Sequence, residues 1–359
     1  MPMEDHKLLY LQNLLQDNQN YYLMDYIQTV VSWEDEARNQ YDRQIVLNSY
    51  QFAEVILLDG IFMIQFVLMC WDRKRRLPND PIFSNQLMLR AVYRDMALLE
   101  NQIPFFIVQR LFKMAFKTHQ QNMPELLELV GWFFKYVTRK EKLPAWVMES
   151  EVKHFVHAIS LSFFPPGMEA PNKRHEEHKE MKFPPSATEL VAAGVKLRKR
   201  ESESLLDIKF ENGVLDMPCL ILTDSVEHYF RNIIAFEQCY WKRRYLTEYM
   251  TFMHHLVDAP RDAELLIDKG IIENWLSNKE AAAQVINAFG KEHSMSRDHH
   301  FYSLSDELIK HCQRPHNKWK ATFKRDYCSS PWVVISVIAA GLLLLLTIAQ
   351  TVFSALSLK

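Results

Sequence analysis

The chain has 359 residues, and its charges nearly balance, with 42 Lys and Arg against 44 Asp and Glu. This balance argues against a basic nucleic-acid-binding protein, so we expect no nucleic-acid partner. Only eight glycines occur, although phosphate-binding loops and all-β folds use many, so the composition favours a mainly α fold. The residues before the apolar C-terminal segment are enough for one large core or two compact units.

Residues 1–164 are expected to form an N-terminal helical part. Apolar residues recur near helical spacing over 5–31, and 34–38 resembles an exposed helix start. The segment 51–71 is apolar enough to suggest a membrane helix, but Asp59 lies at its centre. A carboxylate at that depth costs about 2.5–3.5 kcal/mol on insertion scales. We therefore predict a helix that is buried on all sides in the core.

Four further helices are predicted in this part, over 87–99, 104–117, 124–139 and 144–163. Glu100-Asn-Gln-Ile-Pro104 interrupts the pattern between the first two of them. Ile103 precedes a proline and should be extended, and Pro104 suits the first position of the following helix.

Residues 165–186 are rich in proline and charge, which predicts a polar linker or loop. Residues 187–317 then form a C-terminal helical part with one β-hairpin at about 205–222, because apolar and polar residues alternate around Asn212-Gly213. Pro218 predicts that the second strand of this hairpin is an edge strand or that its pairing with neighbouring strands ends early. Asp224 is the expected cap of the next helix, in which Glu227 and Arg231 can pair.

The remaining helices of this part are predicted over 244–256, 259–269 and 279–289. Gly270 directly follows the second of them and suits the C-cap position, where a left-handed backbone is common.

The segment 332–356 is predicted to be a single transmembrane helix. Val333–Ala349 carries no charge, and the whole segment would span roughly 37 Å. Its neighbour, 318–331, is basic and aromatic, and is predicted to lie at the membrane interface unless it packs on the domain instead. The expected interface residues are Lys318, Trp319, Lys320, Phe323, Lys324, Arg325, Tyr327 and Trp332.

Positive residues collect on the N-terminal side of this segment, and only Lys359 follows it. The positive-inside rule therefore predicts a tail-anchored, single-pass protein whose N-terminal domain faces the cytosol. The sequence leaves open whether the membrane is the plasma membrane or the endoplasmic reticulum.

Motifs for catalysis, cofactors and metals are missing from the sequence, so we expect no catalytic, cofactor-binding or metal residues. His154 and His157 could share a helix face, but an ordinary packed or surface pair is favoured over a ligand pair. Asp59, Glu100 and Glu237 lie among apolar residues and leave a hydrolase open as an alternative. A structural network around the helix break is favoured for these carboxylates.

Several motifs occur in a fixed order along the chain. They are Leu57-Leu-Asp-Gly-Ile-Phe62, Asp95-Met-Ala-Leu-Leu-Glu-Asn-Gln-Ile-Pro-Phe-Phe106, Glu189-Leu-Val-Ala-Ala-Gly-Val195, Leu206-Asp-Ile-Lys-Phe-Glu-Asn-Gly-Val-Leu215, Arg231-Asn-Ile-Ile-Ala-Phe-Glu-Gln238, Asp262-Ala-Glu-Leu-Leu-Ile-Asp-Lys-Gly-Ile271, Trp319-Lys-Ala321 and Ser330-Pro331-Trp332. Together they strongly resemble the plant proteins grouped as domain of unknown function 247.

This resemblance implies a protein without an established biochemical activity. Some members are associated with self/non-self recognition in grass pollination, which implies binding rather than catalysis. Members commonly begin with an upstream segment, and here Met1 stands just before Glu4-Asp-His-Lys7, so the chain is expected to be short at its N-terminus.

The sequence is thus interpreted as a membrane-anchored component of recognition or signalling, with the bilayer and an unidentified protein as partners. The alternatives are the hydrolase and a self-associating structural membrane protein, and the oligomeric state stays open. Thirteen residues are expected to serve in caps, turns and buried polar contacts: Asp59, Gly60, Glu100, Asn101, Gln102, Pro104, Asp207, Asn212, Gly213, Glu227, Arg231, Asn232 and Glu237.

Overall fold

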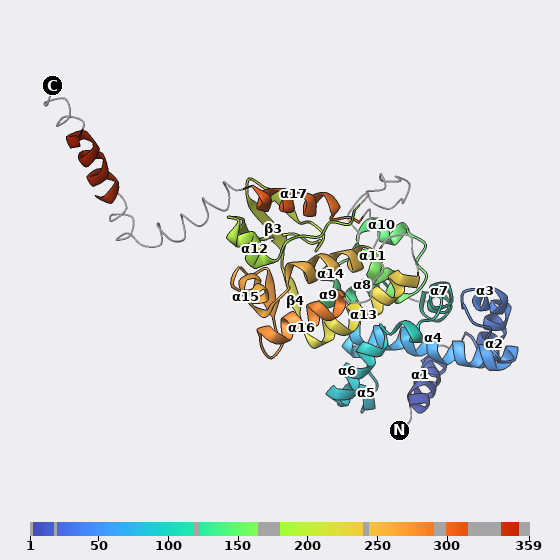
Figure 1. The fold of residues 1–359 in the computed structure, drawn as a ribbon. Coiled ribbons are helices and arrows are strands. Elements are labelled where there is room, and N and C mark those ends of the chain that lie inside the picture. Colours follow the sequence, from blue (N-terminus) through green and yellow to red (C-terminus); the bar gives the residue numbers. More distant parts are fainter. Residues whose placement is uncertain are drawn as a thin grey trace. The chain divides into compact units, whose positions relative to one another are not determined.

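The computed structural model describes residues 3–17, 20–117, 123–163, 180–239, 244–290, 299–314 and 339–351. The chain divides into two compact units. The first unit comprises Met1–Arg174 and Leu222–Thr247, and the second unit comprises His175–Ile221 and Glu248–Lys359. The described residues are mainly helical with small sheets, as the sequence predicts (Figure 1).

The first unit is built from helices, with 3₁₀ turns at Arg73–Arg75 and Leu99–Asn101 and a π-helical turn at Lys113–Lys117. Its helices are α1 (Met3–Asp17), α2 (Leu23–Ser32), α3 (Glu34–Arg38), α4 (Ser49–Trp71), α5 (Pro81–Ser84), α6 (Gln86–Asp95), α7 (Phe105–Phe112), α8 (Leu126–Phe133), α9 (Lys135–Thr138), α10 (Ala145–Glu149), α11 (Phe155–Ser162) and α13 (Asp224–Cys239).

The helix α4 is the centre of the first unit. Asn48 and Gln51 form a capping box at its start, with the Asn48 side chain accepting from the Gln51 N–H at 2.9 Å. The helix packs against α1, α2, α7 and α8 (Figure 1). It is long and apolar enough to cross a bilayer, but 78% of its most apolar window is buried. The prediction of a buried core helix is confirmed.

The close approach of α4 to α7 depends on Gly60. A Cβ atom at this position would lie 2.8 Å from Cδ1 of Leu111, whose side chain is fully buried in α7. A larger residue at position 60 would therefore displace Leu111 or move the two helices apart.

The helix predicted over 87–99 ends earlier, because α6 stops at Asp95 and a 3₁₀ turn follows. Gln102 stabilises this break: its amide donates to the carbonyl oxygens of Met96 (3.1 Å) and Leu98 (2.8 Å). Pro104 is the N-cap of α7 and not its first helical residue, which corrects the prediction. Its ψ of 127° lies outside the helical region.

Two predicted helices are each divided in the structure. The segment 124–139 forms α8 and α9, and 144–163 forms α10 and α11. The second division occurs because His154 is extended, with φ −166° and ψ 178°, and accepts the His157 N–H as the N-cap of α11. His154 therefore precedes the helix and does not share a helix face with His157.

The second unit combines helices with two small sheets. Its helices are α12 (Ala187–Ala192), α14 (Tyr245–Leu256, which begins in the first unit), α15 (Pro260–Asp268), α16 (Lys279–Gly290) and α17 (Tyr302–Gln313). The strands are β1 (Lys196–Arg200), β2 (Lys209–Glu211), β3 (Val214–Pro218), β4 (Leu220–Leu222) and β5 (Ile272–Asn274).

The predicted hairpin is present as β2 and β3, which pair antiparallel around Asn212-Gly213. Both turn residues have a positive φ, 53° and 77°, as a two-residue hairpin turn requires. The expectation that Pro218 makes β3 an edge strand is wrong, since β3 lies between β1 and β2, with β1 parallel to it. The other alternative, an early end of pairing, agrees with the structure, because Pro218 is the last residue of β3 and the pairing of β3 with β2 already ends at Asp216.

The ends of two further helices can be compared with the prediction. The α13 helix already includes Asp224, and the cap is Thr223, whose hydroxyl accepts from the Val226 N–H at 3.1 Å. Gly270 ends α15 as predicted, with φ 68°, and the Ile271 N–H returns to the Leu266 carbonyl at 2.9 Å.

Of the predicted transmembrane segment 332–356, the structure describes a helix over Ala339–Thr351, which is shorter than a bilayer span. All of its described residues are exposed, including Leu342–Leu346. Most of the predicted linker and the eight predicted interface residues, Lys318, Trp319, Lys320, Phe323, Lys324, Arg325, Tyr327 and Trp332, lie outside the described residues.

Candidate functional site

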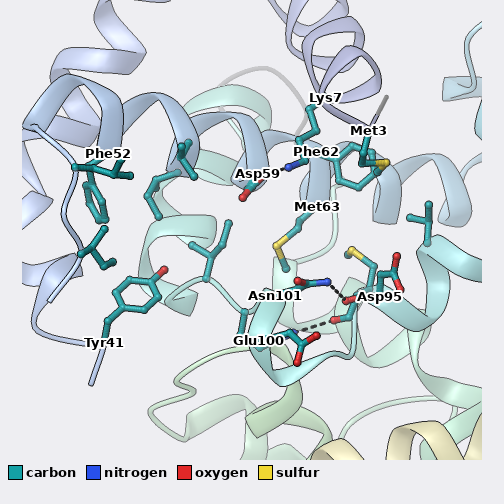
Figure 2. A pocket seen from close by; sticks show the side chains of 18 residues that line it. Met3, Lys7, Tyr41, Phe52, Asp59, Phe62, Met63, Asp95, Glu100 and Asn101 are labelled. Carbon is teal, nitrogen blue, oxygen red and sulfur yellow. Dashed lines mark hydrogen bonds and ion pairs between the residues drawn. The ribbon is translucent and has the colours of Figure 1, made fainter. Parts of the chain in front are cut away.

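The first unit contains a cavity of about 430 Å³ between α1, α4, α6 and the turn after α6. Its floor is apolar and buried, formed by Phe52, Ile56, Phe62, Met63, Val92, Met96 and Ile103. Figure 2 shows these elements and the segment around Tyr41 surrounding one space. We call this space the acidic pocket, because its charged lining residues are Asp59, Asp95, Glu100 and Lys7.

Lys7 on α1 and Asp59 on α4 form an ion pair on one side of the acidic pocket (Figure 2). The Lys7 ammonium lies 2.5 Å from Asp59 and 2.7 Å from Glu4. Burial lowers the pKa of Lys7, but hydrogen bonds and charges from Asp59 and Glu4 outweigh it and raise the pKa overall. The single ammonium of the pocket is thus shared between two carboxylates.

Tyr41 contributes a phenol to the same space. Burial, and then the negative charge of Asp59, raise its pKa to about 12. The Tyr41 hydroxyl is therefore neutral at physiological pH and adds a polar group without charge.

Asp95 and Glu100 line the pocket from the end of α6 and from the 3₁₀ turn. Both residues are exposed, and within the described part of the chain neither forms an ion pair. The turn that carries them is fixed from within, because the Asn101 amide donates to the Asp95 carbonyl at 3.3 Å and Gln102 binds two further carbonyls. The Gln102 side chain also accepts from the Val156 N–H at 3.2 Å.

Glu237 lies elsewhere in the first unit and does not line the acidic pocket. It is 2% exposed, and its carboxylate accepts from the N–H groups of Leu246 (3.1 Å) and Thr247 (2.8 Å) and from the Thr247 hydroxyl (2.6 Å). Burial raises its pKa to about 7, although these three donors lower it. The structure therefore brings Asp59 and Glu100 to one pocket and separates Glu237 from them.

The other residues singled out from the sequence take part in local contacts. Glu227 pairs with Arg231 along α13 at 2.6 Å, and Asp207 accepts from Arg200 at 2.8 Å. Asn232 accepts from the Leu99 N–H at 2.9 Å and donates to the His228 carbonyl at 3.0 Å, which attaches the 3₁₀ turn to α13.

Some residues of the pocket could not be selected from the sequence. Lys7 and Tyr41 stand in polar stretches without any distinguishing pattern, and they reach Asp59 only through the packing of α1 and the 41–47 segment on α4. Asp95 could have been found as a carboxylate next to the helix break. Among the described residues, no group of three or more His, Cys, Asp or Glu is placed to hold a metal ion.

Comparisons with known proteins cover almost the whole chain. Residues 1–346 match the DUF247 family, described as plant protein of unknown function. The chain is 28% identical to UPF0481 protein At3g47200 of Arabidopsis thaliana, over 92% of the chain and 73% of that relative. It is 20% identical to a second Arabidopsis UPF0481 protein, At3g02645, over 97% of the chain and 82% of the relative.

No solved structure matches the chain significantly. The family match spans far more than half of the sequence and includes every residue of the acidic pocket. The chain belongs to the DUF247 family of plant proteins, whose function is described as unknown.

Proposed function

We propose that the chain is a membrane-anchored protein that works by binding, with the acidic pocket of the first unit as a recognition site. The helix over Ala339–Thr351 is the observation that carries the anchoring, because its apolar residues are exposed on all sides. Leu343 to Leu346 are each at least 63% exposed. A helix that is apolar on every face needs an apolar surrounding, and lipid supplies it.

The proposed orientation places the N-terminal domain in the cytosol. Lys318, Lys320, Lys324 and Arg325 precede the apolar segment, and Lys359 follows it. Positive residues are preferentially retained on the cytoplasmic side. The membrane is proposed to be the plasma membrane or the endoplasmic reticulum.

Binding is favoured over catalysis by the groups that line the acidic pocket. Its described lining contains no Ser, Thr, Cys or His side chain, so it offers no aliphatic hydroxyl or thiol nucleophile and no imidazole base. Asp59 is held in an ion pair with Lys7. The pocket offers charge and apolar surface, which suit the selection of a ligand.

Flotation with lipid vesicles tests the anchoring. The intact chain is expected to float with vesicles, and a chain lacking residues 330–359 is expected to stay in the dense fraction. Protease added outside sealed cells should leave the large part of the intact chain uncut. Flotation of the shortened chain, or digestion of the large part, would contradict the proposal.

A hydrolase remains a second candidate, because Asp59 and Glu100 line the same pocket and two carboxylates can act as acid and base. Fluorogenic glycosides and esters test it, with the variants Asp59→Asn and Glu100→Gln. If hydrolysis is detected and both variants lose it while Glu54→Gln keeps it, the protein is an enzyme. If the intact chain hydrolyses none of them above background, the binding function is favoured.

A further inference from the structure

We propose that the acidic pocket binds a small organic cation that joins an ammonium group to an apolar body. This inference rests on the proposed binding function and adds the chemical class of the ligand. Three independent features of the pocket carry it: its size, the apolar character of its floor, and the sign of the charge at its rim.

The size of the pocket suits a small molecule. Its volume of about 430 Å³ falls within the range of about 300–1,000 Å³ that is typical of small-molecule sites. A single lysine or arginine side chain from a protein partner would occupy only part of this space. A compact ligand with a ring or a short chain fits better.

The floor provides the apolar half of the site. Phe62, Met63, Val92, Met96 and Ile103 line it and are each at most 5% exposed. Burial of a ligand's apolar body here contributes about 25 cal/mol per Å² of surface removed from water. The two methionines are flexible and polarisable, so they can adjust to an aromatic or an aliphatic body.

The rim provides the charge. The lining carries three carboxylates and one ammonium, a formal excess of two negative charges. The ammonium of Lys7 is already engaged by Asp59 and Glu4, which leaves Asp95 and Glu100 without an ion-pair partner among the described residues. Such a rim attracts a cation, repels an anion, and gives a neutral ligand no electrostatic advantage.

The rim is also held in position before a ligand arrives. Asn101 and Gln102 bind the carbonyl oxygens of Asp95, Met96 and Leu98, and Asn232 binds the Leu99 N–H. The turn between Asp95 and Ile103 therefore needs little ordering when a ligand binds, which reduces the entropic cost of association. The charged group of the ligand would lie near Glu100, with its apolar body directed to the floor.

The test uses the full chain reconstituted in lipid nanodiscs and three probes of matched size. These are 2-phenylethylammonium, the neutral 2-phenylethanol and the anionic 3-phenylpropionate, titrated by calorimetry with empty nanodiscs as the blank. We expect saturable binding of the ammonium probe, at least tenfold weaker binding of the other two, and weaker binding in high salt.

Two variants locate the site. Glu100→Gln and Asp95→Asn should each lower the affinity for the ammonium probe about tenfold, which corresponds to about 1.4 kcal/mol of binding free energy. Glu54→Gln is the matched control, because Glu54 is exposed on α4 and does not line the pocket. It should bind the probe as the unmodified chain does, and far-UV circular dichroism should be unchanged in all three variants.

The inference is overturned if the ammonium probe shows no saturable binding, or if 2-phenylethanol binds as tightly as the ammonium probe or 3-phenylpropionate binds more tightly. It is also overturned if Glu54→Gln weakens binding of the ammonium probe as much as Glu100→Gln or Asp95→Asn does. Its failure can be distinguished from failure of the proposed function. A chain that floats with vesicles but binds no ammonium contradicts only the ligand class. If the chain does not float, the anchoring is contradicted, and the three probes are then titrated against the full chain in buffer without nanodiscs, so that the ligand class is judged separately.

Discussion

His154 and His157 begin α11 with contacts that require neutral imidazole rings. The His157 N–H donates to Nδ1 of His154 at 3.2 Å, and the Lys153 N–H donates to Nδ1 of His157 at 3.0 Å. Burial, together with nearby positive groups, lowers the pKa of His154 to about 3 and that of His157 to about 4. Protonation of either ring would place a hydrogen on an atom that already accepts one.

These histidines should make stability fall in mild acid. Both pKa values are lower in the folded chain than the ordinary value of about 6.5, so between roughly pH 6.5 and 4 the unfolded chain binds protons that the folded chain does not. The free energy of unfolding therefore decreases as the pH falls below 6.5, and at pH 5 each histidine has lowered it by about 2 kcal/mol. Thermal unfolding followed from pH 7.5 to 5 measures this loss.

The variant His154→Asn separates this effect from other titrating groups. Asparagine can accept the same N–H as an N-cap but does not titrate, so the variant should show a smaller loss of stability in acid. An identical dependence on pH in the variant and the unmodified chain would show that His154 does not contribute.

Glu237 is another buried titrating group, and its effect on stability has the opposite sign. Its pKa is raised to about 7, so its contribution falls as the pH rises from about 4.5 through 7. Glu237→Gln should lower the free energy of unfolding by about 1–3 kcal/mol, because an amide NH₂ would face a backbone N–H donor of Leu246 or Thr247.

Glu227→Gln provides the matched control for this prediction. It makes the same change on the same helix, but at a surface pair with Arg231, which should contribute under about 0.5 kcal/mol. Thermal melts of the two variants should differ clearly. Equal melting temperatures would mean that the Glu237 contacts do not stabilise the fold.

Residue-level roles could be predicted from the sequence only where the partner is close along the chain. The Glu227–Arg231 pair and the Asn212-Gly213 turn follow from local spacing. The apolar residues around Glu237 indicated that it is buried. Its hydrogen-bond donors, Leu246 and Thr247, belong to the next helix and could not be predicted. The Lys7–Asp59 pair joins residues 52 positions apart, and nothing in the sequence relates them.

At the scale of elements, the hairpin of β2 and β3 depends on a left-handed turn. Gly213 has φ 77°, a backbone conformation that alanine adopts only with strain, so Gly213→Ala should destabilise the second unit by about 1 kcal/mol. A steric clash would not cause this loss, because the nearest atom to the added Cβ would be 3.7 Å away. Gly341→Ala is the control, because no atom lies within 4 Å of a Cβ there. Thermal unfolding should shift for the first variant only, and equal shifts would contradict the role of the turn.

Elements with a strong periodic or compositional signal were predicted from the sequence, and others were not. The length and apolar character of α4, together with the central Asp59, were enough to predict a core helix. Strand β1 was missed because four of its five residues are Lys or Arg, and only its pairing with β3 makes it a strand. The break between α10 and α11 was missed because the His154 cap is set by packing and not by a proline or glycine.

At the scale of the whole molecule, the two compact units are not continuous in sequence. Residues 222–247 belong to the first unit although a stretch of the second unit precedes them. The interaction of Asn232 with the Leu99 N–H, across 133 positions, illustrates why chain order does not show this association. The same reason explains why the acidic pocket could not be predicted as a site, since its residues come from separate elements.

Anchoring of the protein depends on the apolar C-terminal helix residing in lipid. The most direct test replaces both Leu344 and Leu345 by arginine, which adds about 5–7 kcal/mol to the free energy of membrane insertion. The control replaces the same two leucines by isoleucine. After alkaline carbonate extraction of membranes, we expect the unmodified chain and the isoleucine control in the pellet and the arginine chain in the supernatant. Equal retention of the arginine chain, or extraction of the unmodified chain, would contradict the account.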